Sequence, residues 1–300
     1  MTQKYRLDKK GYINRKKLIS FKFNGKKYFG YEGDTLASAL LANGVHLVGR
    51  SFKYHRPRGF IGANVEEPNA QVQLYSGAKT EPNAVATTVE LVEGLVAKSQ
   101  NCFPSVSFDF GAINNFLHKF FPAGFYYKTF MWPKNFWYKI YEPIIRKAAG
   151  LGVAPLEPDP DRYEHKFEYC DILVAGSGPS GLASALAAAK NGARVILAED
   201  KPRFGGSLLT DEVTIGNKKG KDWADEIISE LKTMPNVIVK NRSQVFGYYD
   251  HNMLVMFERT KDHIEKPTKF TPRQRLWYIR AKEVIISTGS IERPLVFGNN

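Results

Sequence analysis

The residues best able to do chemistry are three glycines, Gly176, Gly178 and Gly181, which are spaced as Gly-x-Gly-x-x-Gly. The first permits a tight turn, the second lets the backbone approach a phosphate closely, and the third lets a helix pack against a strand. A helix that begins at such a turn directs its unpaired N–H groups and the positive end of its dipole towards a bound anion. The spacing therefore predicts a site for the pyrophosphate of a dinucleotide.

The flanking sequence supplies the elements that this motif needs. An apolar run at residues 170–175 predicts a strand before the glycines, and an alanine-rich run at residues 182–190 predicts a helix after them. A second apolar run, residues 194–198, ends on Glu199, whose carboxylate can accept hydrogen bonds from a ribose hydroxyl. Strand, glycine turn, helix, strand and acid together predict a dinucleotide fold rather than an ordinary glycine turn.

An acid at this place favours an unphosphorylated ribose, and therefore NAD or FAD. Lys201 and Arg203 lie close by in the sequence and leave NADP as an alternative. A glycine pair at residues 205–206 is typical of the flavin- and NAD-binding variants of the fold, and an apolar run at residues 283–289 returns to the same sheet. We assign cofactor binding to Gly176, Ser177, Gly178, Pro179, Ser180, Gly181, Glu199, Asp200, Gly206, Thr288 and Gly289.

From residue 169 the pattern predicts a Rossmann-like α/β domain for FAD or NAD(P), over residues 169–300. The other expected elements are a helix at 221–233, a parallel strand at 237–240 and an antiparallel excursion at 245–258 and 276–280. Such a domain normally continues into a further strand or a second half. We therefore expect it to be truncated at its C-terminus and the 300 residues to be the N-terminal part of a longer polypeptide.

Residues 1–100 predict a small α+β domain of the β-grasp type. Strands are expected at 17–23 and 26–31, joined by an Asn24-Gly25 turn, and further strands at 70–74 and 85–91. Asp34 or Thr35 can cap a helix at 36–43, which Gly44 ends.

Residues 101–168 predict an aromatic-rich connecting segment. Twelve aromatic residues lie between Phe116 and Tyr141, interrupted by prolines and lysines. Packing against neighbours or another subunit is favoured over a role at a membrane surface, because no continuous amphipathic helix is evident. A proline-rich stretch at residues 155–160 predicts a stiff linker.

Length and composition restrict the class of protein. Three hundred residues, 43% of them hydrophobic, suggest about two domains. The sequence has no apolar run long enough for a membrane span and no signal peptide at its N-terminus, so we expect a cytoplasmic protein and no membrane partner. Its two cysteines, Cys102 and Cys170, form no framework or metal-ligand cluster.

The net charge of +13 is concentrated at the N-terminus, where residues 1–60 carry 14 Lys and Arg against three acids. These lysines lie on predicted strands and match no nucleic-acid recognition motif. A solvated face or a docking surface for an acidic partner is therefore favoured over nucleic-acid binding.

Several segments resemble the alpha-subunit family of heterotetrameric sarcosine oxidases. They are residues 49–59 (GRSFKYHRPRG), 67–70 (EPNA), 123–133 (AGFYYKTFMWP), 142–152 (EPIIRKAAGLG) and 291–294 (IERP). The aromatic segment is the most specific of these, whereas the basic run at 49–59 is shared with cyanide synthase and opine oxidase subunits.

This resemblance implies a ferredoxin-like domain, a nucleotide-binding domain associated with NAD, and beta, gamma and delta partner subunits. It implies oxidation of sarcosine with O2 to glycine and hydrogen peroxide, and to methylene-tetrahydrofolate when tetrahydrofolate is present. FAD and FMN are expected in the complete complex, and tetrahydrofolate is bound only through a C-terminal half that these residues lack.

Plant-type iron–sulfur clusters need Cys-x4-Cys-x2-Cys and a distant cysteine. That spacing falls on Gly62, Glu67 and Ala70, with the distant position near Thr87 and Thr88, so we expect a cluster-less ferredoxin-like domain. This demotes electron transfer through the domain and agrees better with sarcosine oxidase than with its cluster-bearing relatives.

No side chain stands out as a catalytic base, so no catalytic residue and no metal ligand are assigned. The histidines show no metal-ligand spacing: His46, His55, His118, His165, His251 and His263. Among the basic run, His55 could help to bind an anion, but a cluster of arginines bracing the backbone is favoured.

Two alternatives to a sarcosine oxidase subunit that holds NAD stay open. One is a pyridine-nucleotide- or FAD-dependent oxidoreductase subunit of the opine oxidase or cyanide synthase type, with FAD at the same site. The other is a non-catalytic scaffold that docks other subunits through its basic and aromatic surfaces.

Overall fold

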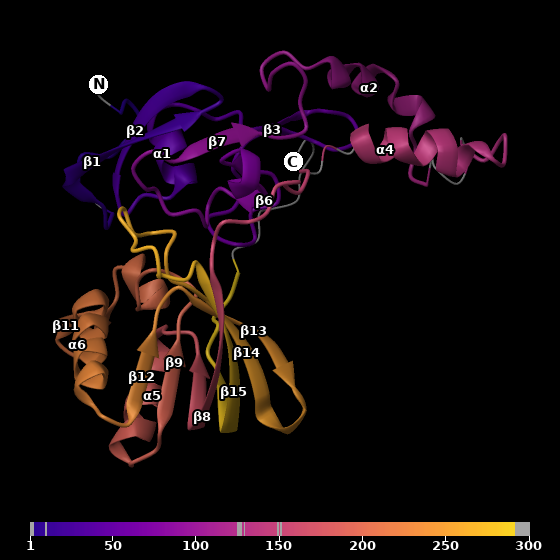
Figure 1. Ribbon diagram of the computed structural model, residues 1–300. Helices are drawn as coiled ribbons and strands as arrows, with labels where there is room; N and C mark the ends of the chain where they lie inside the picture. Colours follow the sequence, from indigo (N-terminus) through magenta and orange to yellow (C-terminus); the bar gives the residue numbers. More distant parts are fainter. Residues whose placement is uncertain are drawn as a thin grey trace. The chain divides into compact units, whose positions relative to one another are not determined.

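The computed structural model in Figure 1 describes residues 3–9, 11–124, 128, 130–148, 150 and 152–291. These residues form two compact units, one up to Pro160 and one from Asp161 to Ile291. The prediction of an α+β domain followed by an α/β domain is confirmed. Parts of all three predicted segments lie outside the described residues. They are 1, 2 and 10 in the first domain, 125–127, 129, 149 and 151 in the aromatic-rich connecting segment, and 292–300 at the predicted end of the second domain.

The first unit is built on a five-stranded sheet in the order β2-β1-β7-β5-β6. The alternation that predicted the first hairpin is confirmed, because Ile19, Phe21 and Phe23 of one strand are buried in the core. The strands are β1 (Asn14–Phe23), β2 (Lys26–Glu32), β5 (Gln71–Leu74), β6 (Glu81–Val85) and β7 (Val96–Ser99).

The helix α1 (Leu36–Ala42) begins with the cap predicted for it. The Thr35 hydroxyl accepts a hydrogen bond from the Ser38 N–H, and the Ser38 hydroxyl accepts one from the Thr35 N–H, which makes a capping box. Gly44 follows the helix with a φ of +79°.

The expected strand at residues 85–91 is wrong. Strand β6 ends at Val85, and the carbonyl oxygens of Ala86 and Val89 accept hydrogen bonds from the N–H groups of Ala37 and Leu36. The segment therefore satisfies the unpaired start of α1 instead of joining the sheet. The remaining strand of the sheet is β7, which pairs parallel to β1 and was not predicted.

The rest of the first unit consists of short elements. They are β3 (Gly49–Arg50), β4 (Pro57–Arg58), η1 (Gly77–Lys79), η2 (Phe110–Ala112), α2 (Ile113–Phe116), η3 (His118–Phe120), η4 (Trp137–Tyr141) and α4 (Glu142–Ala148).

Asp109 anchors the start of the aromatic segment. Its carboxylate accepts hydrogen bonds from the Phe103 and Gly111 N–H groups and lies 2.6 Å from Nδ1 of His55.

The second unit has a six-stranded sheet in the order β12-β9-β8-β15-β14-β13, in which the first four strands are parallel (Figure 1). The larger elements are β8 (Tyr163–Ala175), α5 (Pro179–Lys190), β9 (Val195–Ala198), α6 (Gly220–Thr233), β12 (Val237–Lys240), β13 (Ser243–Tyr249), β14 (Met253–Arg259) and β15 (Gln274–Ile286). The shorter ones are η5 (Gly206–Leu209), β10 (Thr214–Ile215), β11 (Lys218–Lys219) and η6 (Asp250–Asn252).

Both faces of this sheet are packed. On one face Leu182 of α5 and Leu231 of α6 are fully buried against Val174 and Leu197 of the central strands. On the other face a second cluster includes Cys170, Leu173, Ile196, Leu254 and Ile279. Burial on both faces explains the continuous apolar runs that predicted these parallel strands.

Two expected boundaries differ from the structure. Strand β8 begins at Tyr163, inside the predicted connecting segment, because its first half pairs with β15. The runs at 276–280 and 283–286 belong to one strand, β15, which pairs antiparallel with β14 along one edge and parallel with β8 along the other. Polar residues interrupt the apolar pattern between them, so the sequence suggests two elements.

Candidate dinucleotide-binding site

The glycine turn follows directly on β8. Gly176 has a φ of +98°, and its N–H donates to the carbonyl oxygen of Ala198 at the end of β9 over 2.8 Å. A Cβ at Gly176 would lie 2.3 Å from the carbonyl oxygen of Ser287. A Cβ at Gly181 would lie 2.0 Å from the carbonyl oxygen of Gly176, so α5 begins in direct contact with the turn. The positive φ of Gly176 agrees with the tight turn predicted for it, and the close contact at Gly181 agrees with its predicted packing role.

The middle glycine of the motif, in contrast, has open space beside it. Gly178 is the N-cap of α5, with φ −65° and ψ −177°, and a Cβ there would meet nothing within 4 Å. Pro179 and Ser180, the next two residues, are exposed. Because the N–H groups in the first turn of a helix have no acceptor within the helix, they can bind an anion placed over Gly178. The residues present therefore fit a pyrophosphate.

A buried hydrogen-bond network joins the turn to the end of β9. The Ser177 hydroxyl donates to Oε2 of Glu199 over 2.5 Å, and the Ser177 N–H donates to the same oxygen over 3.0 Å. The other oxygen, Oε1, accepts a hydrogen bond from the Lys201 N–H over 3.0 Å. The Gly205 N–H donates to both the hydroxyl and the carbonyl oxygen of Ser177.

Burial raises the pKa of the Glu199 carboxyl group. The residue is 5% exposed, and this desolvation, together with the neighbouring Asp200, raises the pKa of Glu199 to about 7. The hydrogen bonds from Ser177 and Lys201 act in the opposite direction, because they favour the ionised form. The sequence indicated that this acid accepts hydrogen bonds from ribose; it did not indicate that the protein itself already supplies three donors to the carboxylate.

The remaining assigned residues surround the same turn. Gly206 has a φ of +54°, and a Cβ on it would lie 2.8 Å from Cα of Gly178, so the glycine pair packs on the motif. Thr288 follows Ser287, whose N–H donates to the carbonyl oxygen of Ala175, and Gly289 has a φ of +69° with open space beside it.

The assigned residues thus gather where β8, β9 and β15 end, which is where ligands bind in open parallel sheets. Asp200 belongs to this edge, although its side chain is exposed. The sequence analysis noted Gly205 as part of a glycine pair but did not assign it to the site, and it did not single out Ser287. Gly205 has a φ of +122°, which favours glycine, whereas the carbonyl oxygen of Ser287 packs on Gly176, a backbone contact that leaves no signal in residue type.

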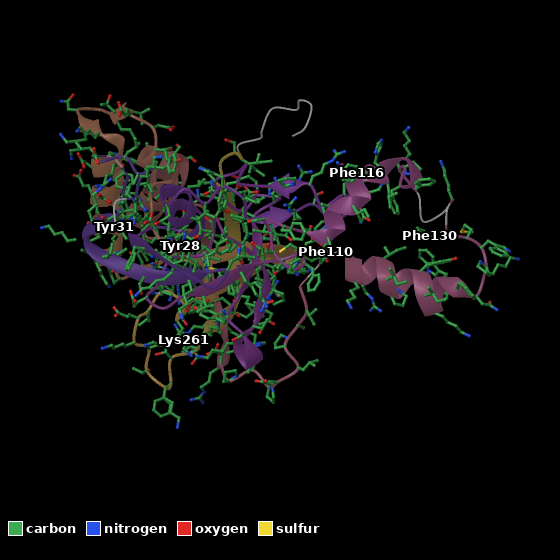
Figure 2. All side chains as sticks on the ribbon, turned by 90° about the horizontal axis from the view of Figure 1, so that it is seen from above. Tyr28, Tyr31, Phe110, Phe116, Phe130 and Lys261 are labelled. Carbon is green, nitrogen blue, oxygen red and sulfur yellow. The ribbon has the colours of Figure 1, made fainter. Side chains whose placement is uncertain are left out.

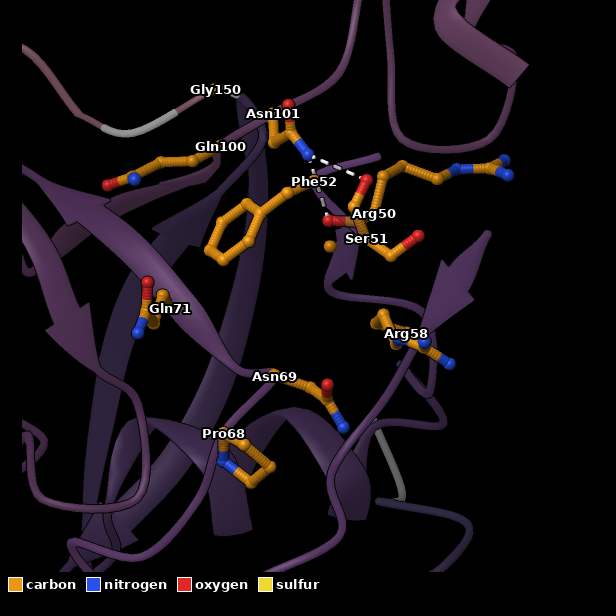
Figure 3. Close-up of a pocket in the computed structure, with 11 residues that line it drawn as sticks. Arg50, Ser51, Phe52, Arg58, Pro68, Asn69, Gln71, Gln100, Asn101 and Gly150 are labelled. Atoms are coloured by element: carbon orange, nitrogen blue, oxygen red, sulfur yellow. Dashed lines mark hydrogen bonds between the residues drawn. The ribbon is translucent and has the colours of Figure 1, made fainter. Parts of the chain in front are cut away.

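The basic run at residues 49–59 braces the backbone, as favoured from the sequence. Arg50 donates to the carbonyl oxygens of Val106 and His55, and His55 itself is buried beside Asp109. A pocket of about 200 Å³ lies next to this run in the first unit. Figure 3 shows the Asn101 amide at its edge, donating to the backbone oxygens of Arg50 and Ser51.

The described residues contain no group of three or more His, Cys, Asp or Glu side chains that could hold a metal ion. Neither cysteine has the lowered pKa that is typical of a reactive thiol. Burial raises the pKa of the Cys170 thiol to about 12, and burial together with Asp109 raises that of Cys102. Among the helices that the structure describes, none is both long and apolar enough to cross a membrane.

Comparison with known families matches the two units separately. Residues 16–102 match the family described as a 2Fe-2S iron-sulfur cluster binding domain, and residues 171–255 match the FAD dependent oxidoreductase family. The second match covers the glycine motif, Glu199 and the antiparallel strands up to the middle of β14.

Similar proteins of known name include sarcosine oxidase alpha subunits. The chain is 54% identical to the alpha subunit from Rhizobium meliloti (strain 1021) over 99% of its length, and 32% identical to that from Corynebacterium sp. (strain U-96) over 96%. It spans 30% and 25% of the lengths of these two relatives. An opine oxidase subunit from Agrobacterium tumefaciens (strain Ach5) is 28% identical over 43% of the chain and is covered over 25% of its own length.

Among solved structures, an L-proline dehydrogenase from P. horikoshii is similar over 96% of this chain and 44% of that one, with a TM-score of 0.58 and 18% identity. At this identity the likeness shows the fold alone. The similarity includes residues of both units.

The residues present do not fit the iron–sulfur cluster that the first family is named for. Cys102 is the single cysteine in residues 16–102, whereas a [2Fe–2S] cluster of this type needs four thiolates. Gly62, Glu67 and Ala70 stand where the spacing requires cysteines. The first unit therefore has the fold of that family without its cluster ligands.

Proposed function

We propose that this chain, a homologue of sarcosine oxidase alpha subunits, holds a dinucleotide within a multi-subunit, amine-oxidising flavoenzyme. The observation that carries the proposal is the open N-terminus of α5 at Gly178 beside the buried acid Glu199. The identity of 54% over 99% of the chain supports the same class of oxidoreductase.

NAD is the first candidate for this site and FAD the second. The acid at the end of β9 favours an unphosphorylated ribose in both cases. The resemblance to the alpha subunits implies NAD, whereas the family matched over residues 171–255 is FAD-dependent. Both dinucleotides present the same pyrophosphate to Gly178.

This chain's own residues bind and orient the dinucleotide. The N–H groups in the first turn of α5 face the pyrophosphate, and Oε1 of Glu199, which accepts one hydrogen bond from the protein, accepts another from ribose. Gly206 packs on Gly178 and holds the second loop against the motif. When bound, a nicotinamide or flavin dinucleotide supplies hydride-transfer chemistry.

The reaction proposed for the complete enzyme is the oxidation of sarcosine by O2 in the presence of tetrahydrofolate, giving glycine, hydrogen peroxide and methylene-tetrahydrofolate. The partners are the beta, gamma and delta subunits in the cytoplasm, with FAD and FMN elsewhere in the complex. We assign tetrahydrofolate binding to none of these 300 residues.

The test is to co-express the chain with its beta, gamma and delta partners and purify the complex. Nucleotides released by denaturation are then identified by mass spectrometry, and sarcosine-dependent hydrogen peroxide is measured. NAD beyond the flavins of the other subunits supports the proposal, and an additional FAD instead favours the second candidate. An active complex without a dinucleotide in this chain would overturn it.

An oxidoreductase subunit of the opine oxidase or cyanide synthase type is the alternative within the same class. It is supported by the similarity to the Agrobacterium opine oxidase subunit over 43% of the chain. The same purified complex distinguishes the two, because peroxide or reduced acceptor would then form with an opine or with glycine and not with sarcosine.

A docking role has its own support in the aromatic segment. Phe116, Trp132 and Tyr138 are more than 80% exposed, and Figure 2 shows Phe110 and Phe116 on the helical segment that starts at η2. Exposed aromatic side chains in a group mark interaction surfaces. Replacing Phe116, Trp132 and Tyr138 by Ser should release the chain from its partner subunits on size-exclusion chromatography.

A matched control replaces three exposed aromatics of β13, Phe246, Tyr248 and Tyr249, by Ser. If both triple variants co-elute with the partners as the wild type does, the aromatic segment has no docking role.

A further inference from the structure

The Glu67 carboxylate lies buried at the centre of a tight loop. Its Oε2 atom accepts hydrogen bonds from the Ile61 and Gly62 N–H groups, each over 2.6 Å. Its Oε1 atom accepts hydrogen bonds from the Asn69 and Ala70 N–H groups over 2.7 and 3.1 Å. The residue is 2% exposed, so these four backbone donors take the place of water.

Four donors satisfy a carboxylate almost completely, because its two oxygens offer about four lone-pair sites. Within the described part of the chain, no Lys or Arg forms an ion pair with Glu67. Burying a charge without such partners is costly, and hydrogen bonds to an ionised acceptor are about twice as strong as neutral ones. The loop is thus shaped around an anion that belongs to the chain itself.

The same loop carries the positions at which the matched family would need cysteines. A Cβ on Gly62 would lie 3.1 Å from Cα of Glu67, so the first position faces the second. The Ala86 N–H donates to the carbonyl oxygen of Ala70, and the Thr87 hydroxyl donates to that of Asn64 over 2.5 Å. Loop 61–70 and the segment with the fourth position are therefore in contact.

We propose that the Glu67 carboxylate replaces the iron–sulfur cluster as the anion that organises this loop. In iron–sulfur proteins, thiolates ligate the cluster and its sulfurs accept hydrogen bonds. Here one side chain collects the backbone donors, and the loop keeps its closed form without metal. The domain consequently serves as a rigid structural module and passes no electrons through a cluster.

The test uses the chain in complex with its partners and two variants, Glu67→Gln and Glu67→Ala. Hydrogen–deuterium exchange of peptides covering residues 61–70 should become at least about tenfold faster in both, because the amides lose a charged acceptor. Glu66→Gln is the matched control, since Oε1 of Glu66 accepts only two longer bonds of 3.2 and 3.1 Å and the residue is less buried. Its exchange should stay within about twofold of the wild type.

Sodium formate provides a positive test, because a small carboxylate can enter the space left in Glu67→Ala. Formate should restore protection of residues 61–70, whereas formamide, which is neutral, should not. Unchanged exchange in both Glu67 variants would overturn the proposal.

Measurements on the wild-type complex test the role of Glu67 even if the variants do not fold. Its 61–70 amides should be as protected as those of β1, and this chain should contribute no iron or acid-labile sulfide. Two irons with two labile sulfides bound to this chain, or unprotected amides in the wild type, would show that Glu67 does not organise the loop.

Discussion

The Ser177 hydroxyl donates a hydrogen bond of 2.5 Å to the Glu199 carboxylate, and both residues are buried. This contact ties the first variable residue of the glycine motif to the acid at the end of the next strand. The turn that we propose for the phosphates and the acid that we propose for the ribose are therefore joined by a direct hydrogen bond. A substitution of either residue should therefore alter the hydrogen bonding of the other.

Replacing Ser177 by Ala should raise the pKa of Glu199 further, because the hydrogen bond from the hydroxyl favours the ionised carboxylate. At pH 7 the variant should bind the dinucleotide about tenfold more weakly, as expected for losing a hydrogen bond to a charged group. Isothermal titration calorimetry at several pH values measures both effects. Ser229→Ala on α6, whose hydroxyl bonds only within its helix, is the control and should bind like the wild type.

Replacing Glu199 by Gln should alter how stability depends on pH. The pKa of Glu199 is raised from 4.5 to about 7, so its stabilising contribution is fully present below pH 4.5 and is lost as the pH rises through 7. The nucleotide-free wild type should therefore lose more melting temperature between pH 5.5 and pH 8 than the Gln variant. Equal losses in the two proteins would show that Glu199 does not titrate in this range.

Dinucleotide affinity should depend on the same ionisation of Glu199, but in the opposite direction: it should rise with pH while the stability of the nucleotide-free protein falls. The ionised carboxylate is the better acceptor for ribose hydroxyls, so wild-type affinity should fall as the pH drops below about 7. In Glu199→Gln this pH dependence should disappear. Affinity that falls equally in both proteins would place the titrating group elsewhere.

Substitutions at two glycines of the motif should affect the free energy of unfolding very differently. Gly181→Ala places a Cβ 2.0 Å from the carbonyl oxygen of Gly176, and should destabilise the second unit by about 1–3 kcal/mol. Gly178→Val meets open space at an ordinary φ of −65°, so its free energy of unfolding should stay within about 0.5 kcal/mol of the wild type. Urea unfolding of both variants makes the comparison, and an equally large loss for Gly178→Val would mean that the space beside it is filled.

Replacing Asp109 by Ala should loosen the start of the aromatic segment. The change removes the acceptor for the Phe103 and Gly111 N–H groups and the partner of the buried His55 ring. We expect a loss of about 2–4 kcal/mol in the stability of the first unit and faster proteolysis near residues 101–121. Glu142→Ala, which removes only an exposed ion pair with Arg146, should change stability by about 0.5 kcal/mol or less.

Patterns that depend on local periodicity could be predicted from the sequence. The first hairpin, the helix α1 and the strand–turn–helix at Gly176 follow from alternation, capping residues and glycine spacing. The physical cause in each case is contained within a few consecutive residues.

Features that depend on distant partners could not be predicted in this way. Strand β7 has only four residues and is recognisable as a strand only beside β1 and β5. The segment after Val85 has strand-forming residues, but α1 uses its carbonyl groups. The burial of Glu67 and its four donors likewise depends on loop closure, which the spacing of residue types does not reveal.

The central claim is that the turn at Gly178 holds a dinucleotide, and calorimetric titration of the nucleotide-free complex with NAD and with FAD tests it most directly. The wild type should bind one of them at a single site in this chain. Gly178→Val, with an unchanged melting temperature, should bind neither there, because its side chain occupies the space for the pyrophosphate. Equal binding by the wild type and this variant would contradict the assignment of the site.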